Sequence, residues 1–509
     1  MDKSDGKDYK KKGAVSIQKM NTGSRLDYRA EADWMILYKD EKPKAEMFYV
    51  GYTAVDEKED ENGTGRPVTF VFNGGPGASS VYLHIGALGP KRVELTPEGM
   101  PQAPPYRLAD NEETWLEFSD LVFIDPIGTG FSRTMQEDSG GSGKTGDAAK
   151  SSTGADAAGS AGADKEKPDN EYWKLNRDLE SLSEFIRKYL SKYNRWESPV
   201  YLAGESYGGF RVGKLVKMLQ QDYGVGLSGA VLISPALEFD LLNSSDYDVL
   251  PWVDTFPTMA GAAAFHGKSR KLKKGESIAE IRARAADFAV NELLPVLAGG
   301  DLISESRRVR VLNAAADFIG LPREKVRAAG GRIGIEYFVK NMLRAEQRVL
   351  GLYDASSTTA DPYPDRDGFG SPDPTLHQLE RVFAAGINTQ LRAGIGLRTE
   401  KDYDLLSETV NESWKLDTKQ HALDMKVGAV DDLRYGMSLN PDMKVYISHG
   451  IFDLVTPSFS TDRLTALMKL TPEQKQNLTV KHYSGGHMYY SWAESRKSFF
   501  EDMRAFYWT

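Results

Sequence analysis

The sequence predicts an α/β protein with a mostly parallel central sheet, and three observations lead to this fold class. Short apolar runs with the composition of buried strands recur along the 509 residues, and amphipathic helical patterns separate them. Several of these runs end in glycine-rich turns, as strands do where a parallel sheet meets its functional loops. A long stretch with helical periodicity interrupts the alternation, which indicates a helical insertion within one α/β domain.

The strands of the expected sheet differ in kind along the chain. Residues 1–30 are polar and are predicted to form a loose N-terminal arm. Alternation of apolar and polar residues between Trp34 and Tyr52 predicts antiparallel edge strands. The buried strands are expected at Val68–Phe72, Leu121–Ile124, Val200–Ala203 and Ala230–Ser234, and the sheet is expected to resume with strands at Lys444–Ser448 and Leu478–Tyr483.

Two segments are expected to lie outside the α/β core. Residues 136–167 are rich in Gly, Ser, Ala and Asp and are predicted to be a disordered surface insertion. Residues 237–440 are predicted to form a helical lid over the sheet, with helices at Ser277–Leu297, Glu305–Phe318, Arg323–Glu346 and His377–Ile387. The α/β domain then comprises residues 31–236 and 441–509.

The segment Gly204–Gly208 reads Gly-Glu-Ser-Tyr-Gly and stands between an expected strand and an expected helix. In that context G-x-S-x-G is typical of the nucleophile elbow of an α/β-hydrolase fold. The glycines allow a sharp turn at Ser206, and the N–H of Tyr207 is expected to face the oxygen of an attacked group. Because the bare pattern is common, an ordinary strand–helix turn holding a serine is the alternative.

A serine nucleophile needs a base, and the chain has seven histidines. His487 lies in a glycine turn directly after the last expected strand, on the sheet rim that also carries Ser206. Asp453 follows the preceding strand, whereas Asp442 lies before that strand and therefore at the wrong end. Since the order Ser206, Asp453, His487 is the one that α/β-hydrolases use, the sequence predicts a Ser-His-Asp triad.

Two glycine-rich segments near this triad have different interpretations. Asn73-Gly-Gly-Pro-Gly77 follows an early strand and is the candidate for a second oxyanion N–H. The run from Gly208 to Lys214 matches most of a phosphate-binding P-loop. Leu215 stands where Mg²⁺ binding requires Ser or Thr, so nucleotide binding is not expected.

These residues resemble the serine carboxypeptidase family, the relatives of carboxypeptidase Y and cathepsin A, in a bacterial type of member. The matching blocks are Asn73–Ser80 with Gly89-Pro90, Phe123–Ser132, Gly204–Gly209, Asp453 and Gly486–Met488. The resemblance implies release of single amino acids from peptide C-termini through an acyl-enzyme on Ser206. It also implies that His487 is the base and then the acid, and that Asp453 orients the imidazole.

The family's remaining roles carry over to further positions. Gly75 and Tyr207 would donate the oxyanion N–H bonds, and Met488 would line the substrate pocket. Asn73 and Glu205 would hold the terminal carboxylate of the substrate. Because two like charges in a tight site force one group to bind a proton, carboxypeptidase activity is expected to peak on the acidic side.

The sequence departs from the family at several of these blocks. Val71 replaces the family's tryptophan, and Ala87 replaces a glutamate that shares a proton network with the carboxylate-binding residues. Ala78 stands in place of a cysteine, and Tyr489-Tyr490 follows Gly-His-Met where the family usually has Val-Pro. The resemblance to the family therefore supports recognition of the substrate carboxylate only in part.

Composition limits the partners and the cofactors. The net charge is −9 without a dense Lys/Arg face, so nucleic acid and anionic membranes are not expected partners. The chain has no cysteine, which excludes disulfides, thiolate chemistry and Cys-bearing zinc sites. No cofactor or metal is expected, and the expected partners are peptides with a free C-terminus. The oligomeric state stays open.

Neither a signal peptide nor a run long enough to span a bilayer is expected. The chain as written is therefore expected to be cytoplasmic, with an exported or periplasmic protein whose signal has been removed as the alternative. For function, an esterase or acyltransferase on the same triad and an inactive binding or scaffold protein are the rival hypotheses. Side-chain preference at the scissile bond and activation by proteolysis stay open.

Overall fold

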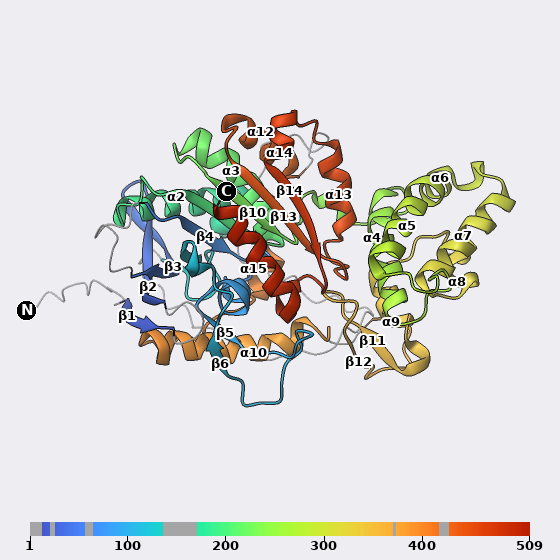
Figure 1. Ribbon diagram of the computed structural model, residues 1–509, viewed down its shortest axis with the longest axis horizontal. Helices are drawn as coiled ribbons and strands as arrows, with labels where there is room; N and C mark the ends of the chain where they lie inside the picture. The colour runs from blue at the N-terminus through green and yellow to red at the C-terminus, as the bar shows by residue number, and fades with distance from the viewer. Residues whose placement is uncertain are drawn as a thin grey trace, which may run out of the picture.

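The computed structural model describes residues 13–20, 26–55, 65–135, 170–369, 373–416 and 427–508. Figure 1 shows a central sheet with helices on both sides and a group of helices set apart beyond one end of it. The predicted disordered insertion at 136–167 and the first twelve residues of the predicted arm lie outside the described residues. Within the described ranges, no helix is long and apolar enough to cross a bilayer.

A ten-stranded sheet runs through the molecule in the order β1-β2-β3-β7-β4-β9-β10-β13-β14, with β8 beside β3. The strands from β7 to β14 in this order pair in parallel, and β1, β2, β3 and β8 add antiparallel pairs at one edge. The predicted mostly parallel sheet is confirmed. Its strands are β1 Ala14–Lys19, β2 Asp27–Lys39, β3 Lys42–Ala54, β4 Val68–Phe72, β7 Asp120–Ile124, β8 Arg133–Thr134, β9 Val200–Glu205, β10 Gly229–Ile233, β13 Lys444–Gly450 and β14 Leu478–Tyr483.

The inner strands are apolar because helices cover both of their faces. Every residue of β4, β7, β9 and β10 is buried, as is usual in a doubly covered parallel sheet. Val200 and Leu202 of β9 pack into the core on one face, and Tyr201 and Ala203 pack into the core on the other. One face carries α2 Leu175–Lys192, α3 Tyr207–Asp222 and α12 Val430–Leu439, and the other carries α1 Val81–Leu83, η1 His84–Leu88, α10 Leu376–Asn388 and α15 Ala493–Trp508.

Six helices and a hairpin form a subdomain with a hydrophobic core of its own. In Figure 1 they lie in yellow-green beyond α13 Ser458–Leu467, to one side of the sheet. We call this part, residues 250–360, the helical subdomain. It comprises α4 Leu250–Phe265, α5 Ile278–Phe288, α6 Leu294–Gly299, α7 Glu305–Ile319, α8 Arg323–Ala328, α9 Ile335–Asn341, β11 Arg348–Leu350 and β12 Thr358–Ala360.

The predicted single lid at 237–440 is divided among three places, and the prediction needs this correction. Besides the helical subdomain, α10 packs into the core on one sheet face, and α12 packs beside α3 on the other. Between them, Trp414 contacts the rings of Tyr207 and Phe239. Helical periodicity identifies an apolar face but not the surface that this face covers, so the division was not visible in the sequence.

The predicted loose arm at 1–30 also needs correction, because β1 and the start of β2 fall within it. These two strands pair in antiparallel register, with Ala14 opposite Ala32 and Lys19 opposite Asp27. Polar side chains on the exposed side of an edge strand are common because they discourage pairing with other chains. The charge in this segment therefore masked an alternation that buries Tyr28 and Ala30.

The remaining elements are short connections. They are the hairpin strands β5 Lys91–Val93 and β6 Leu108–Asp110, and the helices α11 Glu408–Ser413 and α14 Pro472–Gln476. The 3₁₀ turns are η2 Trp115–Glu117, η3 Glu171–Trp173, η4 Phe239–Leu241, η6 Gly300–Leu302, η7 Arg344–Glu346 and η10 Tyr489–Ser491, and the π-helical segments η5 Ala289–Leu293 and η8 Thr389–Ile395 continue α5 and α10.

Candidate active site

Ser206 occupies the sharp turn between β9 and α3 in a backbone conformation that a non-glycine residue rarely adopts. Its φ is 62° and its ψ is −123°, and strained turns of this kind cluster at functional sites. The glycines near Ser206 are required because a side chain would not fit at these positions. A Cβ on Gly204 would collide with the Gly208 carbonyl, and one on Gly208 would lie 2.5 Å from the Phe72 carbonyl oxygen. The turn therefore has the geometry of a nucleophile elbow.

His487 and Asp453 are in direct contact. The Nδ1 atom of His487 lies 2.7 Å from Oδ2 of Asp453, and both side chains are buried. The other carboxylate oxygen accepts bonds from the backbone N–H groups of Val455, at 2.8 Å, and Thr456, at 3.0 Å. The Thr456 hydroxyl also donates to Oδ2, at 2.6 Å. The acid is thus fixed by its own loop and presents one oxygen to the imidazole.

The environment of His487 favours the imidazolium form. Burial opposes a charged ring, but the charge of Asp453 and its hydrogen bond outweigh burial, and Glu205 adds to the attraction. The pKa of His487 is therefore raised above its ordinary value. The neutral imidazole in this environment is therefore a stronger base than usual, and once it has taken a proton it holds the charge next to the acid.

A cavity of about 110 Å³ brings most of the predicted site residues together. Apolar side chains, among them Leu376, Leu406 and Val455, form much of its wall. No hydrogen bond joins the Ser206 hydroxyl to another residue that the structure describes, and such contacts often form only when a substrate is bound. The predicted residues that line the cavity are Asn73, Gly75, Glu205, Ser206, His487 and Met488.

The predicted oxyanion loop lies against the elbow. A Cβ on Gly74 would lie 2.5 Å from the backbone nitrogen of Tyr207, and Gly75 has a φ of 98° that favours glycine. Tyr207 is the first residue of α3, where a helix leaves its N–H without an intrahelical acceptor. Its side chain points elsewhere and donates to Asp178 at 3.0 Å, so only its backbone is available to the cavity.

Glu205 is buried beside Ser206 and is held by two neighbours. The Tyr490 hydroxyl lies 2.9 Å and 3.0 Å from its two oxygens, and the side-chain amide of Asn73 donates to it as well. Asn73 in turn accepts the N–H of Leu83 at 3.0 Å. Burial raises the pKa of Glu205 to about 7, although His487, Tyr490 and Asn73 each lower it.

Sequence reasoning missed several residues around this cavity. Tyr490 was visible only as a departure from the family pattern, and Tyr82 and Tyr353 line the cavity from segments without a motif. Arg211 was also missed. It donates from Nη1 to the Asn73 carbonyl at 2.7 Å and from Nε to Asp178 at 2.8 Å, which ties the oxyanion loop to the helices behind it. A lone arginine after a glycine pair carries no signal that would have revealed this.

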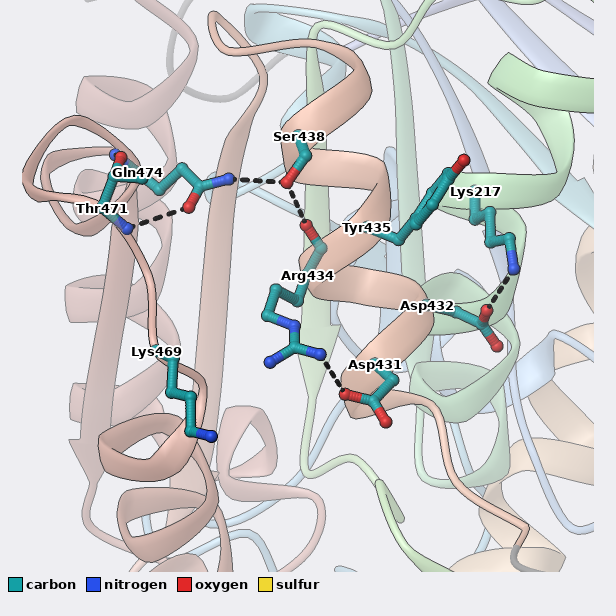
Figure 2. Close-up of a pocket in the computed structure, with 9 residues that line it drawn as sticks. All are labelled: Lys217, Asp431, Asp432, Arg434, Tyr435, Ser438, Lys469, Thr471 and Gln474. Carbon is teal, nitrogen blue, oxygen red and sulfur yellow. Dashed lines mark hydrogen bonds and ion pairs between the residues drawn. The ribbon is translucent and has the colours of Figure 1, made fainter.

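A larger cavity of about 520 Å³ lies away from these residues, between α12, α3 and the segment around α14. Figure 2 shows ion pairs among the charged side chains of α3 and α12 at its wall, whereas Lys469 has no partner among the residues drawn. Lys217 lies 3.1 Å from Asp432, and Arg434 lies 2.8 Å from Asp431. Because these charges are already neutralised and the cleft lacks a nucleophile with a base, size alone does not make it the functional site.

With the geometry established, known proteins can be compared. Residues 25–239 match the model of the serine carboxypeptidase family. The predicted resemblance is confirmed. The match includes the oxyanion loop and the elbow, whereas Asp453 and His487 lie beyond it. The match to this family supports a hydrolase. The strand order and the elbow described above show that the chain has the α/β-hydrolase fold.

Two relatives illustrate how far the similarity extends. The pheromone-processing carboxypeptidase KEX1 of Saccharomyces cerevisiae is 28% identical over 177 residues, which cover 33% of this chain and 19% of that protein. The KEX1 protein of Tuber melanosporum is 28% identical over 139 residues, which cover 27% of this chain and 16% of that protein. The chain thus spans less than a fifth of the length of these relatives.

Two solved structures match the chain at low identity. Proline iminopeptidase of Mycobacterium smegmatis has a TM-score of 0.35 and 12% identity, with 94% of this chain and 97% of that chain covered. The peroxisomal α/β-hydrolase Lpx1 of Saccharomyces cerevisiae has a TM-score of 0.38 and 10% identity, with 95% and 90% covered.

Proposed function

We propose that this protein is a serine carboxypeptidase that hydrolyses the last peptide bond of a substrate through an acyl-enzyme on Ser206. The observation that carries the proposal is the buried contact of 2.7 Å between His487 and Asp453, together with the cavity that His487 and Ser206 both line. The sequence match over residues 25–239 supports the substrate class.

In the first half of the proposed reaction, His487 takes the proton of the Ser206 hydroxyl. The serine oxygen then bonds to the carbonyl carbon of the scissile peptide, and the carbonyl oxygen becomes an oxyanion that accepts the N–H groups of Gly75 and Tyr207. The carbon–nitrogen bond breaks as His487 returns the proton to the leaving amine. The released product is the C-terminal amino acid, and the remaining peptide is an ester of Ser206.

The second half reverses these roles with water. His487 takes a proton from a water molecule, whose oxygen attacks the ester carbon, and the same N–H groups stabilise the second oxyanion. Collapse of this intermediate returns the proton to Ser206 and frees the shortened peptide. Asp453 keeps its carboxylate form throughout and holds the imidazole in the tautomer that each step needs.

Specificity for a free C-terminus is proposed to come from Asn73 and Glu205. A substrate carboxylate beside Glu205 repels an ionised side chain, so Glu205 takes a proton and donates it in a hydrogen bond. Its pKa of about 7, raised by burial, makes this proton available at neutral and acidic pH.

The first prediction compares two peptides that differ only in having a free C-terminal carboxylate or its amide. The wild-type protein is expected to trim the free acid stepwise, and mass spectrometry of the products measures this. Ser206→Ala should abolish both trimming and labelling by a fluorophosphonate probe.

Other outcomes separate the rival functions. Equal hydrolysis of acid and amide would favour an esterase or acyltransferase that uses the same residues. A folded wild-type protein that neither trims peptide nor reacts with the probe would favour a binding or scaffold role.

A further inference from the structure

The turn between β11 and β12 belongs to the helical subdomain but lies against both loops of the proposed catalytic pair. We call residues 351–357 the bracing loop. It closes on itself through backbone bonds from Gly351 to Ser357 and from Ser357 to Asp354, each of 3.0 Å. Its two flanking strands pair in antiparallel register. The bracing loop is thus a defined turn rather than an irregular connection.

One side of the bracing loop holds the segment that carries Asp453. The N–H of Leu454 donates to the Leu352 carbonyl at 3.2 Å, and the N–H of Ala355 donates to the Phe452 carbonyl at 2.9 Å. Phe452 and Leu454 are also buried in the core of the helical subdomain, together with Ala355. The two neighbours of the catalytic acid are therefore part of that core.

The other side holds the turn that carries His487. The backbone N–H of His487 donates to the Tyr353 carbonyl at 2.6 Å, and the two rings meet edge to face with 5.4 Å between their centroids. Gly486 is packed so closely that a Cβ would collide with the Tyr353 carbonyl and with Asp354. The ring of the base is thus bounded by the bracing loop on its protein side.

The Asp354 side chain fixes this contact. It is buried and accepts hydrogen bonds from the indole N–H of Trp492, at 3.1 Å, and from the N–H of Ser356, at 2.9 Å. It also accepts a hydrogen bond from the backbone of Gly486. Trp492 and Gly486 both belong to the segment after β14 that contains His487. One carboxylate therefore joins the bracing loop to the histidine segment from two directions.

The hairpin that presents the bracing loop is anchored in the helical subdomain. Lys340 of α9 lies 2.6 Å from Asp361, just after β12, and both side chains are almost fully inaccessible to solvent. Leu350 of β11 belongs to the subdomain core. A paired, buried charge of this kind is strongly destabilising to break, so it fixes the hairpin to the helices.

We infer that the bracing loop is a positioning element of the active site, which sets the relative placement of His487 and Asp453, with Asp354 as its principal positioning residue. This inference rests on the proposed function, since it assigns the loop a part in that reaction. In this view the helical subdomain acts on catalysis through the base and the acid rather than only by covering the sheet. A displacement of about 1 Å in a catalytic group can cost roughly a hundredfold in rate.

The test is the Asp354→Asn variant of the full chain. It should lower kcat for a free-acid peptide roughly 10- to 100-fold with little change in KM, because alignment rather than substrate contact is lost. The proton between His487 and Asp453 is expected to give a far-downfield NMR resonance in the wild type, and this signal should broaden or shift in the variant. Trp492→Phe, which removes one donor to Asp354, should produce a smaller change in the same direction and serves if Asp354→Asn does not fold.

The matched control is Asp317→Asn. Asp317 is also a buried acid of the helical subdomain, but its partners are Arg270 and Arg323. The Asp317→Asn variant should have a lower free energy of unfolding but keep the NMR resonance and the kcat of the wild type. Unchanged kcat and resonance in folded Asp354→Asn and Trp492→Phe would overturn the inference. Full hydrolysis by His487→Ala would instead overturn the proposed function.

Discussion

At the scale of single residues, Glu205 is proposed to link the pH dependence of the protein to its choice of substrate. The groups that face it are His487, Asp453, Tyr490, Asn73 and, farther off, the phenols Tyr82 and Tyr353. Burial raises its pKa to about 7, so the side chain changes charge in the neutral range. A neutral Glu205 can donate to a carboxylate, whereas an ionised one repels it.

The kcat/KM for a free-acid peptide is therefore expected to fall as pH rises through about 7. Tyr490→Phe removes a donor that stabilises ionised Glu205, which raises the pKa of Glu205 further and should move this fall to higher pH. Glu205→Gln should remove the fall, at reduced activity. The measurement is kcat/KM against pH for the free acid, with the matching amide as the control that lacks this limb. A wild-type profile still rising above neutral pH would contradict the role of Glu205.

At the scale of elements, the elbow and the oxyanion loop are held by a buried charge pair between α2 and α3. Arg211 donates to Asp178 from Nε at 2.8 Å and from Nη2 at 3.0 Å, and Nη1 reaches the Asn73 carbonyl. Tyr207, next to the nucleophile, donates to the same carboxylate. The two helices and the loop after β4 are therefore fixed together directly beneath Ser206.

Arg211→Met is expected to lower the free energy of unfolding by roughly 3–5 kcal/mol, because it leaves the Asp178 carboxylate buried and unpaired. It should also lower kcat, since the Asn73 carbonyl loses its donor. Urea unfolding and steady-state kinetics measure the two effects. Lys39→Met, which breaks an exposed pair with Glu171, is the control and should leave the free energy of unfolding nearly unchanged. Similar losses in both variants would argue against a structural part for the buried pair.

At the scale of the whole molecule, the described residues form three hydrophobic cores. Two lie on the faces of the sheet, and the third lies in the helical subdomain but includes Phe452 and Leu454 beside the proposed acid. The subdomain is thus joined to the active site through its interior. A change deep in its core should reach the catalytic loops before it reaches the sheet.

Phe338 is fully buried in that third core, and Phe338→Ala is expected to cost about 3–5 kcal/mol locally. Hydrogen exchange measured by mass spectrometry should speed up in residues 250–361 and 452–454, while β4 and β9 stay protected. Leu202→Ala, in the core of the sheet, is the comparison and should affect β9 and its neighbours instead. Uniformly faster exchange in both variants would mean that the molecule opens as one unit.

The local structure around the site was predictable because it depends on short-range signals. Buried strands are apolar on both faces, glycines mark turns that tolerate no Cβ, and functional residues in parallel sheets follow strand ends. Ser206 comes directly after the buried strand β9, and Asp453 and His487 lie in the loops after β13 and β14, so their arrival at one rim follows from strand order alone.

Only the tertiary structure decided the contacts between residues that are far apart in the sequence and belong to no motif. Tyr490 meets Glu205 across 285 positions of the chain, and Tyr353 meets His487 from a segment without any motif. The positions of α10 and α12 likewise depended on which apolar surfaces of the sheet the other elements left uncovered. A sequence pattern fixes the face that an element must bury, but its partner depends on how the whole chain packs, and packing is a property of all the elements together.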